Sequence, residues 1–364
     1  MFTYEFLQNY WWAIISLLGG LLVFLMFVQG GNSLIFITKD EEERQLIVNS
    51  TGRKWEFTFT TLVTFGGAYW VWILLLVTFV FQAVSYEFQT KLGNLLGRNT
   101  FRTFLLINGC LGPFIVGAAV STFFTGSDFI VNKAAVGESL APTISVWGNE
   151  WHGLEALANP FTIAFGLTVM FLTQVLGGMY MQGSIEDERL EGKLVRAVRW
   201  TSGLFLAAFL ACMAMLLTMP GYAVDSAGVI SVEEYKYLHN FIQTPSVAII
   251  FLLGVLFVLL GIGIQFFGRR KRMSIWLTGA GTVPAVMSLF LIAGYNGTAY
   301  YPSCSDLQSS LTISNSCSSE FTLRTMAWVS LAIPFVLAYI FFAWRAIDRR
   351  RLTRREMEIT EDKY

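Results

Sequence analysis

The sequence predicts an all-α protein, a polytopic bundle of transmembrane helices that forms one domain over residues 1–364. Hydrophobic residues make up 54% of the chain and charged residues only 14%, and the mean hydropathy is +0.56. An ordinary soluble domain carries roughly 25% charged residues. The zero net charge gives no reason to expect a nucleic-acid partner. Composition therefore excludes a soluble globular fold.

Eight apolar runs reach the length of a membrane span, which is roughly 20 residues for an α-helix. Aromatic residues such as Trp11, Trp147 and Trp344 lie near the ends of these runs, where a membrane interface favours them. Paired glycines and amides inside the runs are expected to serve close helix packing. The predicted spans are 10–36, 57–84, 103–125, 160–184, 200–219, 246–268, 274–295 and 323–347.

The segments between the runs differ in their content of Lys and Arg. By the positive-inside rule, the basic segments are predicted to face the cytoplasm. The remaining loops, 126–159 and 220–245, contain one Lys each and are predicted to lie outside. The basic segments are 38–56, 86–102, 186–199, 269–272 and 349–351.

One pair of loops conflicts with this alternation, because 38–56 and 86–102 are both basic although a single run separates them. A hairpin broken at Gly66-Gly67 would place both loops on one side. Two full spans need about 40 residues, however, and the run from Phe57 to Val84 has 28. We therefore predict one helix from Glu56 to Glu87, about 46 Å long at 1.5 Å per residue, with the two acids on opposite sides of the membrane.

Polar groups at the edges of the spans are the candidates for function. Carboxylates this close to hydrocarbon are costly and are functional candidates by default, although Glu56 and Glu87 could also mark the water boundary. Gln29 and Asn32 close the first span with two amides. Amides and carboxylates that are linked by water can relay protons. The sequence thus allows two interpretations: the acids take part in a proton relay, or they only mark the water boundary.

The positions of the histidines and cysteines limit the cofactors and cross-links that the chain can have. The two histidines, His152 and His239, fall in outer loops, so the spans offer no imidazole pair for a b-type haem. No nucleotide-binding motif is present and we predict no metal site. Cys304 and Cys317 share one outer loop and could close a disulfide in an oxidising compartment.

Several short motifs, in their order and spacing, resemble subunit II of cytochrome bd-type quinol oxidases, and most closely the branch found in Bacteroidetes. The resemblance runs along nearly the whole chain. The motifs are Tyr4-Glu5 before Trp11-Trp12, Glu43-Arg44, Asn49-Ser50, Trp55-Glu56, Tyr86-Glu87-Phe88 with Lys91, Asn159-Pro160-Phe161, Thr244-Pro245 and Ser310-Leu311-Thr312.

The resemblance implies a multi-pass protein of the bacterial inner (cytoplasmic) membrane, with nine helices where eight runs are counted here. It implies a partner, subunit I, which carries haem b, haem d and the site for quinol, with menaquinol as the expected substrate. This chain alone is expected to bind no haem, although a structural quinone, membrane lipid and a small single-helix accessory subunit are compatible with the family.

The resemblance also assigns roles to residues. Glu56 and Glu87, with Trp55 and Lys91 beside them, fall at the family's proton pathway. Gln29 and Asn32 stand where the family has two acids, and amides cannot titrate. Two alternatives stay open at this stage: a secondary transporter or ion channel that uses Glu56 and Glu87 as ion sites, and a structural membrane anchor that needs no acids.

Overall fold

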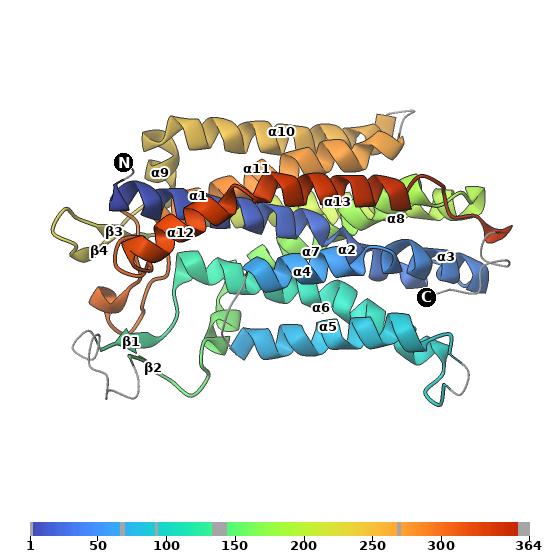
Figure 1. Ribbon diagram of the computed structural model, residues 1–364, viewed down its shortest axis with the longest axis horizontal. Coiled ribbons are helices and arrows are strands. Elements are labelled where there is room, and N and C mark those ends of the chain that lie inside the picture. The colour runs from blue at the N-terminus through green and yellow to red at the C-terminus, as the bar shows by residue number, and fades with distance from the viewer. Residues whose placement is uncertain (1–2, 66–69, 92–93, 133–143, 268–270, 356–364) are drawn as a thin grey trace.

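The computed structural model describes residues 3–65, 70–91, 94–132, 144–267 and 271–355, which form an elongated bundle of helices along one axis (Figure 1). The helices and strands are α1 (Tyr4–Leu25), α2 (Phe27–Asn32), η1 (Ile35–Ile37), α3 (Glu41–Gly52), α4 (Trp55–Phe65), α5 (Trp70–Phe88), α6 (Arg98–Thr125), β1 (Phe129–Val131), β2 (Ser145–Trp147), η3 (Leu154–Ala158), α7 (Pro160–Ser184), α8 (Glu188–Thr218), β3 (Gly221–Val224), β4 (Ile230–Glu233), α9 (Lys236–Gln243), α10 (Pro245–Phe267), η4 (Lys271–Met273), α11 (Ser274–Gly294), η5 (Leu307–Ser309), α12 (Glu320–Ser330) and α13 (Ile333–Ile347).

Seven of the eight predicted spans are confirmed. Among the described residues, seven helical segments are long and apolar enough to cross a membrane. The last of them, formed by α12 and α13, has only 6% of its apolar window buried, so it lies at the periphery of the bundle. The seven segments are 4–37, 98–125, 160–184, 188–218, 245–267, 274–294 and 320–347.

The eighth prediction, one helix from Glu56 to Glu87, is wrong. Helix α4 ends at Phe65 and α5 begins at Trp70. The ring of Trp55 lies 6.4 Å from that of Tyr86, and the ring of Phe59 lies 6.2 Å from that of Phe79. Because residues further along α4 contact residues earlier in α5, the two helices run antiparallel.

The described parts of the hairpin pack on other helices along one face. Leu62 of α4 and Leu75 of α5 pack in one apolar cluster with Leu22 and Met26 near the end of α1 and with Ile115 of α6. One face of each arm is therefore covered by protein, whereas the opposite face of α5 is exposed. Packing on neighbouring helices reduces the cost of placing a hairpin in hydrocarbon, on which the single-helix prediction rested. The loops 38–56 and 86–102 now lie at one end of the bundle (Figure 1), which removes the charge conflict. We call this the basic end and the opposite one the outer end.

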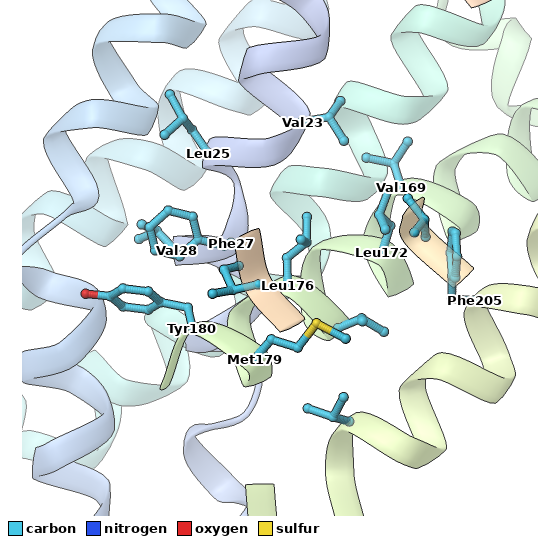
Figure 2. Close-up of a cluster of buried hydrophobic side chains, with 14 of the residues drawn as sticks. Val23, Leu25, Phe27, Val28, Val169, Leu172, Leu176, Met179, Tyr180 and Phe205 are labelled. Carbon is cyan, nitrogen blue, oxygen red and sulfur yellow. The ribbon is translucent and has the colours of Figure 1, made fainter. Parts of the chain in front are cut away.

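The first span is interrupted near the basic end, where α1 stops at Leu25 and α2 begins at Phe27. All six residues of α2 are buried, and Phe27 and Val28 lie beside Leu176 and Tyr180 of α7 in the apolar core (Figure 2). Glycines permit this close approach. A Cβ added at Gly177 of α7 would overlap the backbone nitrogen of Gly31, and one at Gly109 of α6 would meet the nitrogen of Ser33. Helix α2 is thus held between α6 and α7.

This packing gives a first prediction. Gly177→Ala should strongly destabilise the protein, by about 3 kcal/mol or more, because the added methyl group overlaps the backbone of α2 and cannot be accommodated by a rotamer change. Gly183→Ala in the same helix is the matched control, since an added Cβ there meets nothing within 4 Å. Thermal melts of the two purified variants should separate them clearly. Equal melting temperatures would contradict the packing of α2 on α7.

The outer end carries two antiparallel hairpins, β1–β2 with Phe129 opposite Trp147 and β3–β4 with Gly221 opposite Glu233. A bridge between Ser127 and Ser303 ties the start of the first hairpin to the long loop before α12. At the basic end, Leu352 pairs with Ile185 and so brings the C-terminal segment to the loop between α7 and α8.

Candidate functional site

The two predicted acids lie at the same end of the α4–α5 hairpin. Glu56 is in the first turn of α4 and Glu87 is in the last turn of α5, and both side chains are exposed. Neither carboxylate forms an ion pair with a described residue, and the same is true of the exposed Lys91. The prediction that Glu56 and Glu87 lie on opposite sides of the membrane is therefore wrong, because their helix is a hairpin and not one rod.

An aromatic pair lies beside the acids. Trp55 precedes Glu56 and Tyr86 precedes Glu87, and their rings stack with 6.4 Å between centroids. Tyr86 is fully buried, and its hydroxyl donates to Asn32 Oδ1 at 2.7 Å. The indole Nε1 of Trp55 is buried without a hydrogen-bond partner among the described residues. Tyr86 therefore links the helix end that carries Glu87 to the buried polar groups.

These buried polar groups form a cluster where α2, α3, α5 and α6 meet. Thr51 Oγ1 donates to Asn32 Oδ1 at 2.8 Å, and Gln29 Nε2 donates to Gln82 Oε1 at 2.9 Å. Asn108 of α6 has no solvent exposure and precedes Gly109, which packs against the backbone of Gln29. With Tyr86 and Asn108, these side chains are the buried polar cluster. The predicted candidates Gln29 and Asn32 are thus both part of it.

Hydrogen bonding in the cluster is incomplete. Gln29 Oε1, Asn32 Nδ2, Gln82 Nε2 and both side-chain polar atoms of Asn108 are buried and have no partner among the described residues. Buried polar atoms in native proteins are nearly always satisfied, commonly by ordered water. A cluster of this composition can hold water, although none of its members is a carboxylate. It can therefore conduct protons through water but cannot store one as a titrating acid.

A buried arginine of α6 forms an ion pair with the start of α3. Arg102 of α6 is 1% exposed, and its Nη1 donates to Glu41 at 2.6 Å. Arg98 reaches the same carboxylate at 3.0 Å. The hydrogen bond from Arg102 lowers the pKa of Glu41 to about 2, and Glu41 is therefore ionised at neutral pH. The Nε and Nη2 atoms of Arg102 are buried without a partner among the described residues, so the hydrogen-bonding capacity of this guanidinium is only partly used.

A buried lysine lies one residue before Trp55. The side chain of Lys54 has no solvent exposure, and its Nζ is 2.9 Å from Asp348 Oδ2. It also lies 4.5 Å from the ring centre of Trp344. Tyr180 donates to the second oxygen of Asp348 at 3.1 Å. Burial lowers the pKa of Lys54 to about 8, and the charge of Asp348 opposes this shift.

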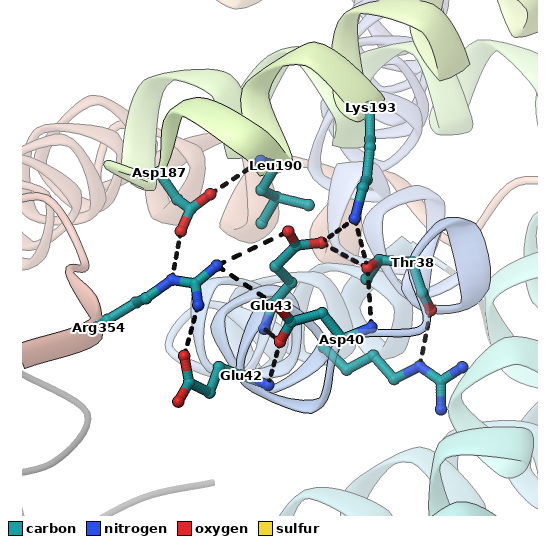
Figure 3. A network of polar contacts seen from close by, with 9 residues as sticks. Thr38, Asp40, Glu42, Glu43, Asp187, Leu190, Lys193 and Arg354 are labelled. Carbon is teal, nitrogen blue, oxygen red and sulfur yellow. Dashed lines mark hydrogen bonds and ion pairs between the residues drawn. The ribbon is translucent and has the colours of Figure 1, made fainter.

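Charged side chains at the basic end tie α3, α8 and the C-terminal segment together (Figure 3). Arg354 Nε is 2.6 Å from Asp187, and the same guanidinium contacts Glu42. Lys193 is 2.6 Å from Glu43, whose side chain is 1% exposed. These contacts fix the start of α3, the helix that leads to Lys54 and Glu56.

The predicted disulfide is not formed. Cys304 and Cys317 are both free, because each thiol is held by a different part of the protein. Cys304 Sγ lies 3.5 Å from the carbonyl oxygen of Thr125 at the end of α6, whereas Cys317 Sγ accepts from Gln8 of α1 at 2.9 Å.

We therefore expect Cys304 and Cys317 to react with iodoacetamide in the folded protein without reductant, since both have some solvent exposure. Buried Cys212 is the internal control and should react only after denaturation. Intact masses recorded with and without prior reduction should agree. If reduction increased the number of alkylated thiols, Cys304 and Cys317 would be bridged and this expectation would be wrong.

The residues present do not fit a haem in this chain. His239 lies in α9 at the outer end and its Nδ1 is 2.7 Å from Glu233, while His152 lies in a turn before η3. Neither histidine is in a membrane-spanning helix. Within the described residues, no group of three His, Cys, Asp or Glu side chains could hold a metal ion.

Sequence reasoning missed part of the cluster. Tyr86 was named only as part of a motif, Asn108 is one of the amides that were expected to serve helix packing, and Gln82 and Thr51 were not predicted. An amide inside an otherwise apolar run, as at Gln82, was the available indication. The burial of Lys54 and Arg102 was not predicted because both stand in segments that are basic overall.

These features define a multi-pass helical membrane protein with exposed acids at one membrane edge and a buried polar cluster beside them. The chain belongs to the cytochrome bd terminal oxidase subunit II family, because the sequence profile of that family matches residues 7–347. The resemblance to this family found in the sequence motifs is thus confirmed.

Individual relatives align with this chain over nearly its full length. The chain is 25% identical over 398 aligned residues to cytochrome bd-I ubiquinol oxidase subunit 2 of Escherichia coli (strain K12), which covers 98% of each chain. It is 21% identical over 384 residues to cytochrome bd ubiquinol oxidase subunit 2 of Bacillus subtilis (strain 168), which covers 96% of this chain and 98% of that one. A chain of the bd oxidase from Geobacillus thermodenitrificans has the same fold, with a TM-score of 0.62 over 93% of this chain and 98% of that chain at 14% identity.

Proposed function

We propose that this chain is the subunit without haem of a bd-type terminal oxidase, a complex that oxidises quinol and reduces O₂ to water. The observation that carries the proposal is the family match from residue 7 to residue 347, joined to the fold shared with a bd oxidase. The haem chemistry belongs to a partner, subunit I, since the histidines of this chain do not fit a haem. The family match does not support the transporter or channel alternative.

The finer assignments follow from the same reasoning. The complex resides in the bacterial inner (cytoplasmic) membrane, with the basic end inside, because the Lys- and Arg-rich loops gather there. The partner carries haem b and haem d, and menaquinol is the expected substrate. A small single-helix accessory subunit and a structural quinone are compatible with the assembly.

The part we propose for this chain is proton entry. Glu56 and Glu87 are exposed at the basic end and can exchange protons with the cytoplasm. The buried polar cluster is joined to this end of the hairpin through Tyr86, whose ring packs on Trp55. The amide atoms that have no partner among the described residues can hold the water that carries protons onward. Lys91 adds a positive charge at the same end. Since Gln29 and Asn32 cannot titrate, Glu56 and Glu87 are the titrating members of this path.

The test is to purify the chain from its native membrane and to record the visible spectrum, the subunit composition and quinol-dependent O₂ consumption. We expect bands of haem b and haem d, a second large subunit and O₂ uptake that requires quinol. A homogeneous preparation of this chain without haem or partner, which transports ions when reconstituted, would reject the proposal.

A further inference from the structure

A basic cavity lies at the basic end, where α7, α11 and α13 meet. Its volume is about 910 Å³, and its wall includes Arg272, Arg345 and Arg349 together with Trp344 and Asp348. Arg272 precedes α11, whereas Arg345 and Arg349 lie in and just after the last turn of α13. Two segments that are far apart in sequence thus bring three guanidinium groups to one cavity.

No described residue balances the positive charge of this cavity. Among the described residues, none of Arg272, Arg345 and Arg349 forms an ion pair. The carboxylate of Asp348 lines the cavity but is already bound by Lys54 at 2.9 Å and by Tyr180 at 3.1 Å. Within the described part of the chain, the cavity therefore has three cations without an ion pair, an arrangement that favours an anionic ligand.

An apolar groove of about 560 Å³ adjoins the cavity and is formed by α1, α4, α12 and α13. Trp276, Phe341 and Trp344 line both spaces. The hydroxyls in the groove are engaged by their own helices: Thr60 donates to Glu56 O and Ser330 donates to Ala327 O, each within 2.8 Å. The groove thus presents almost purely hydrocarbon to a ligand.

A buried donor lies at the junction of the two spaces. Trp344 is 5% exposed, and its indole Nε1 has no hydrogen-bond partner among the described residues. A buried N–H group without a partner is unusual in a native protein. A polar ligand group at the junction would satisfy it.

We infer that the cavity and the groove together bind one anionic phospholipid of the phosphatidylglycerol type. Its phosphate lies among the three arginines, and an acyl chain follows the groove beneath α12 and α13. A basic pocket between helices on the cytoplasmic side, continuous with an apolar surface, is the arrangement that recognises anionic headgroups. A soluble anion would leave the groove empty, and a neutral lipid would leave the arginines unpaired.

The test is native mass spectrometry of the purified protein, with any subunit that accompanies it, titrated with phosphatidylglycerol or phosphatidylcholine in detergent. Each arginine near a membrane surface contributes about fivefold in affinity for an anionic lipid, the factor that corresponds to roughly 1 kcal/mol. Arg345→Gln with Arg349→Gln should thus weaken phosphatidylglycerol binding about 25-fold and leave phosphatidylcholine unchanged. Arg350→Gln is the control, since Arg350 is exposed beside Arg349 but does not line the cavity.

Four results would overturn the inference. These are unchanged phosphatidylglycerol binding by the double variant, equal loss in Arg350→Gln, equal binding of both lipids by the wild type, and loss of an accompanying subunit without any change in bound lipid. The last result would assign the arginines to an acidic segment of a partner protein. If the double variant fails to fold, Arg345→Gln alone should show the fivefold effect.

Discussion

Glu56→Gln and Glu87→Gln should each slow quinol-dependent O₂ consumption by roughly 100-fold while the haem content of the complex stays normal. Both carboxylates are exposed at the basic end, where they can take up protons from water. A glutamine keeps the size and hydrogen-bonding capacity of the side chain but cannot titrate. Loss of one group that transfers protons costs about 100-fold or more when no water chain replaces it. Oxygen-electrode rates of the purified variants measure the effect.

Glu188→Gln is the matched control. Glu188 is an exposed acid in the first turn of α8, also at the basic end, and forms no ion pair with a described residue. Its substitution should leave the rate unchanged, which excludes a general effect of surface charge. Normal turnover in both Glu56→Gln and Glu87→Gln would show that protons enter the complex elsewhere.

Asp348→Asn should lower the stability of the protein by about 3 kcal/mol, because it leaves Lys54 buried without its counter-ion. Lys54→Met should not show this loss, since Asp348 keeps its hydrogen bond from Tyr180 and is partly exposed to water. The variant that carries both substitutions should recover most of the stability lost in Asp348→Asn. Thermal melts at pH 7 compare the three proteins. Equal losses in the two single variants would contradict this account of the pair.

The same lysine predicts a dependence of stability on pH. Burial lowers the pKa of Lys54 from its ordinary value of 10.5 to about 8. Below pH 8 the lysine is protonated in the folded and the unfolded chain, and the cost of burying its charge is present in full. Between pH 8 and pH 10.5 only the unfolded chain retains the proton, so this group makes stability rise with pH. Lys54→Met should remove that rise, which melts at pH 7 and pH 10 would detect.

Hydropathy was sufficient to predict seven of the spans, because each of them is a long apolar run with polar ends. The family was also accessible from the sequence, because short motifs such as Trp55-Glu56 and Tyr86-Glu87-Phe88 occur in the order and spacing that the resemblance requires. The α4–α5 hairpin was not predicted because a length rule treats each run as if lipid surrounded it. In the folded protein, Leu62 and Leu75 pack against α1 and α6 instead.

The candidate site shows the same division between sequence and tertiary structure. The chain by itself determined that Glu56, Glu87 and Lys91 lie at membrane edges, since a charged side chain leaves hydrocarbon whatever the neighbouring helices do. Only the tertiary structure decided that the two acids share one end and that Gln82 meets Gln29 across 53 residues of sequence. It also decided that Lys54 is buried against Asp348, 294 residues later in the chain. These contacts depend on which helices pack together, and hydropathy along the chain contains no information about that choice.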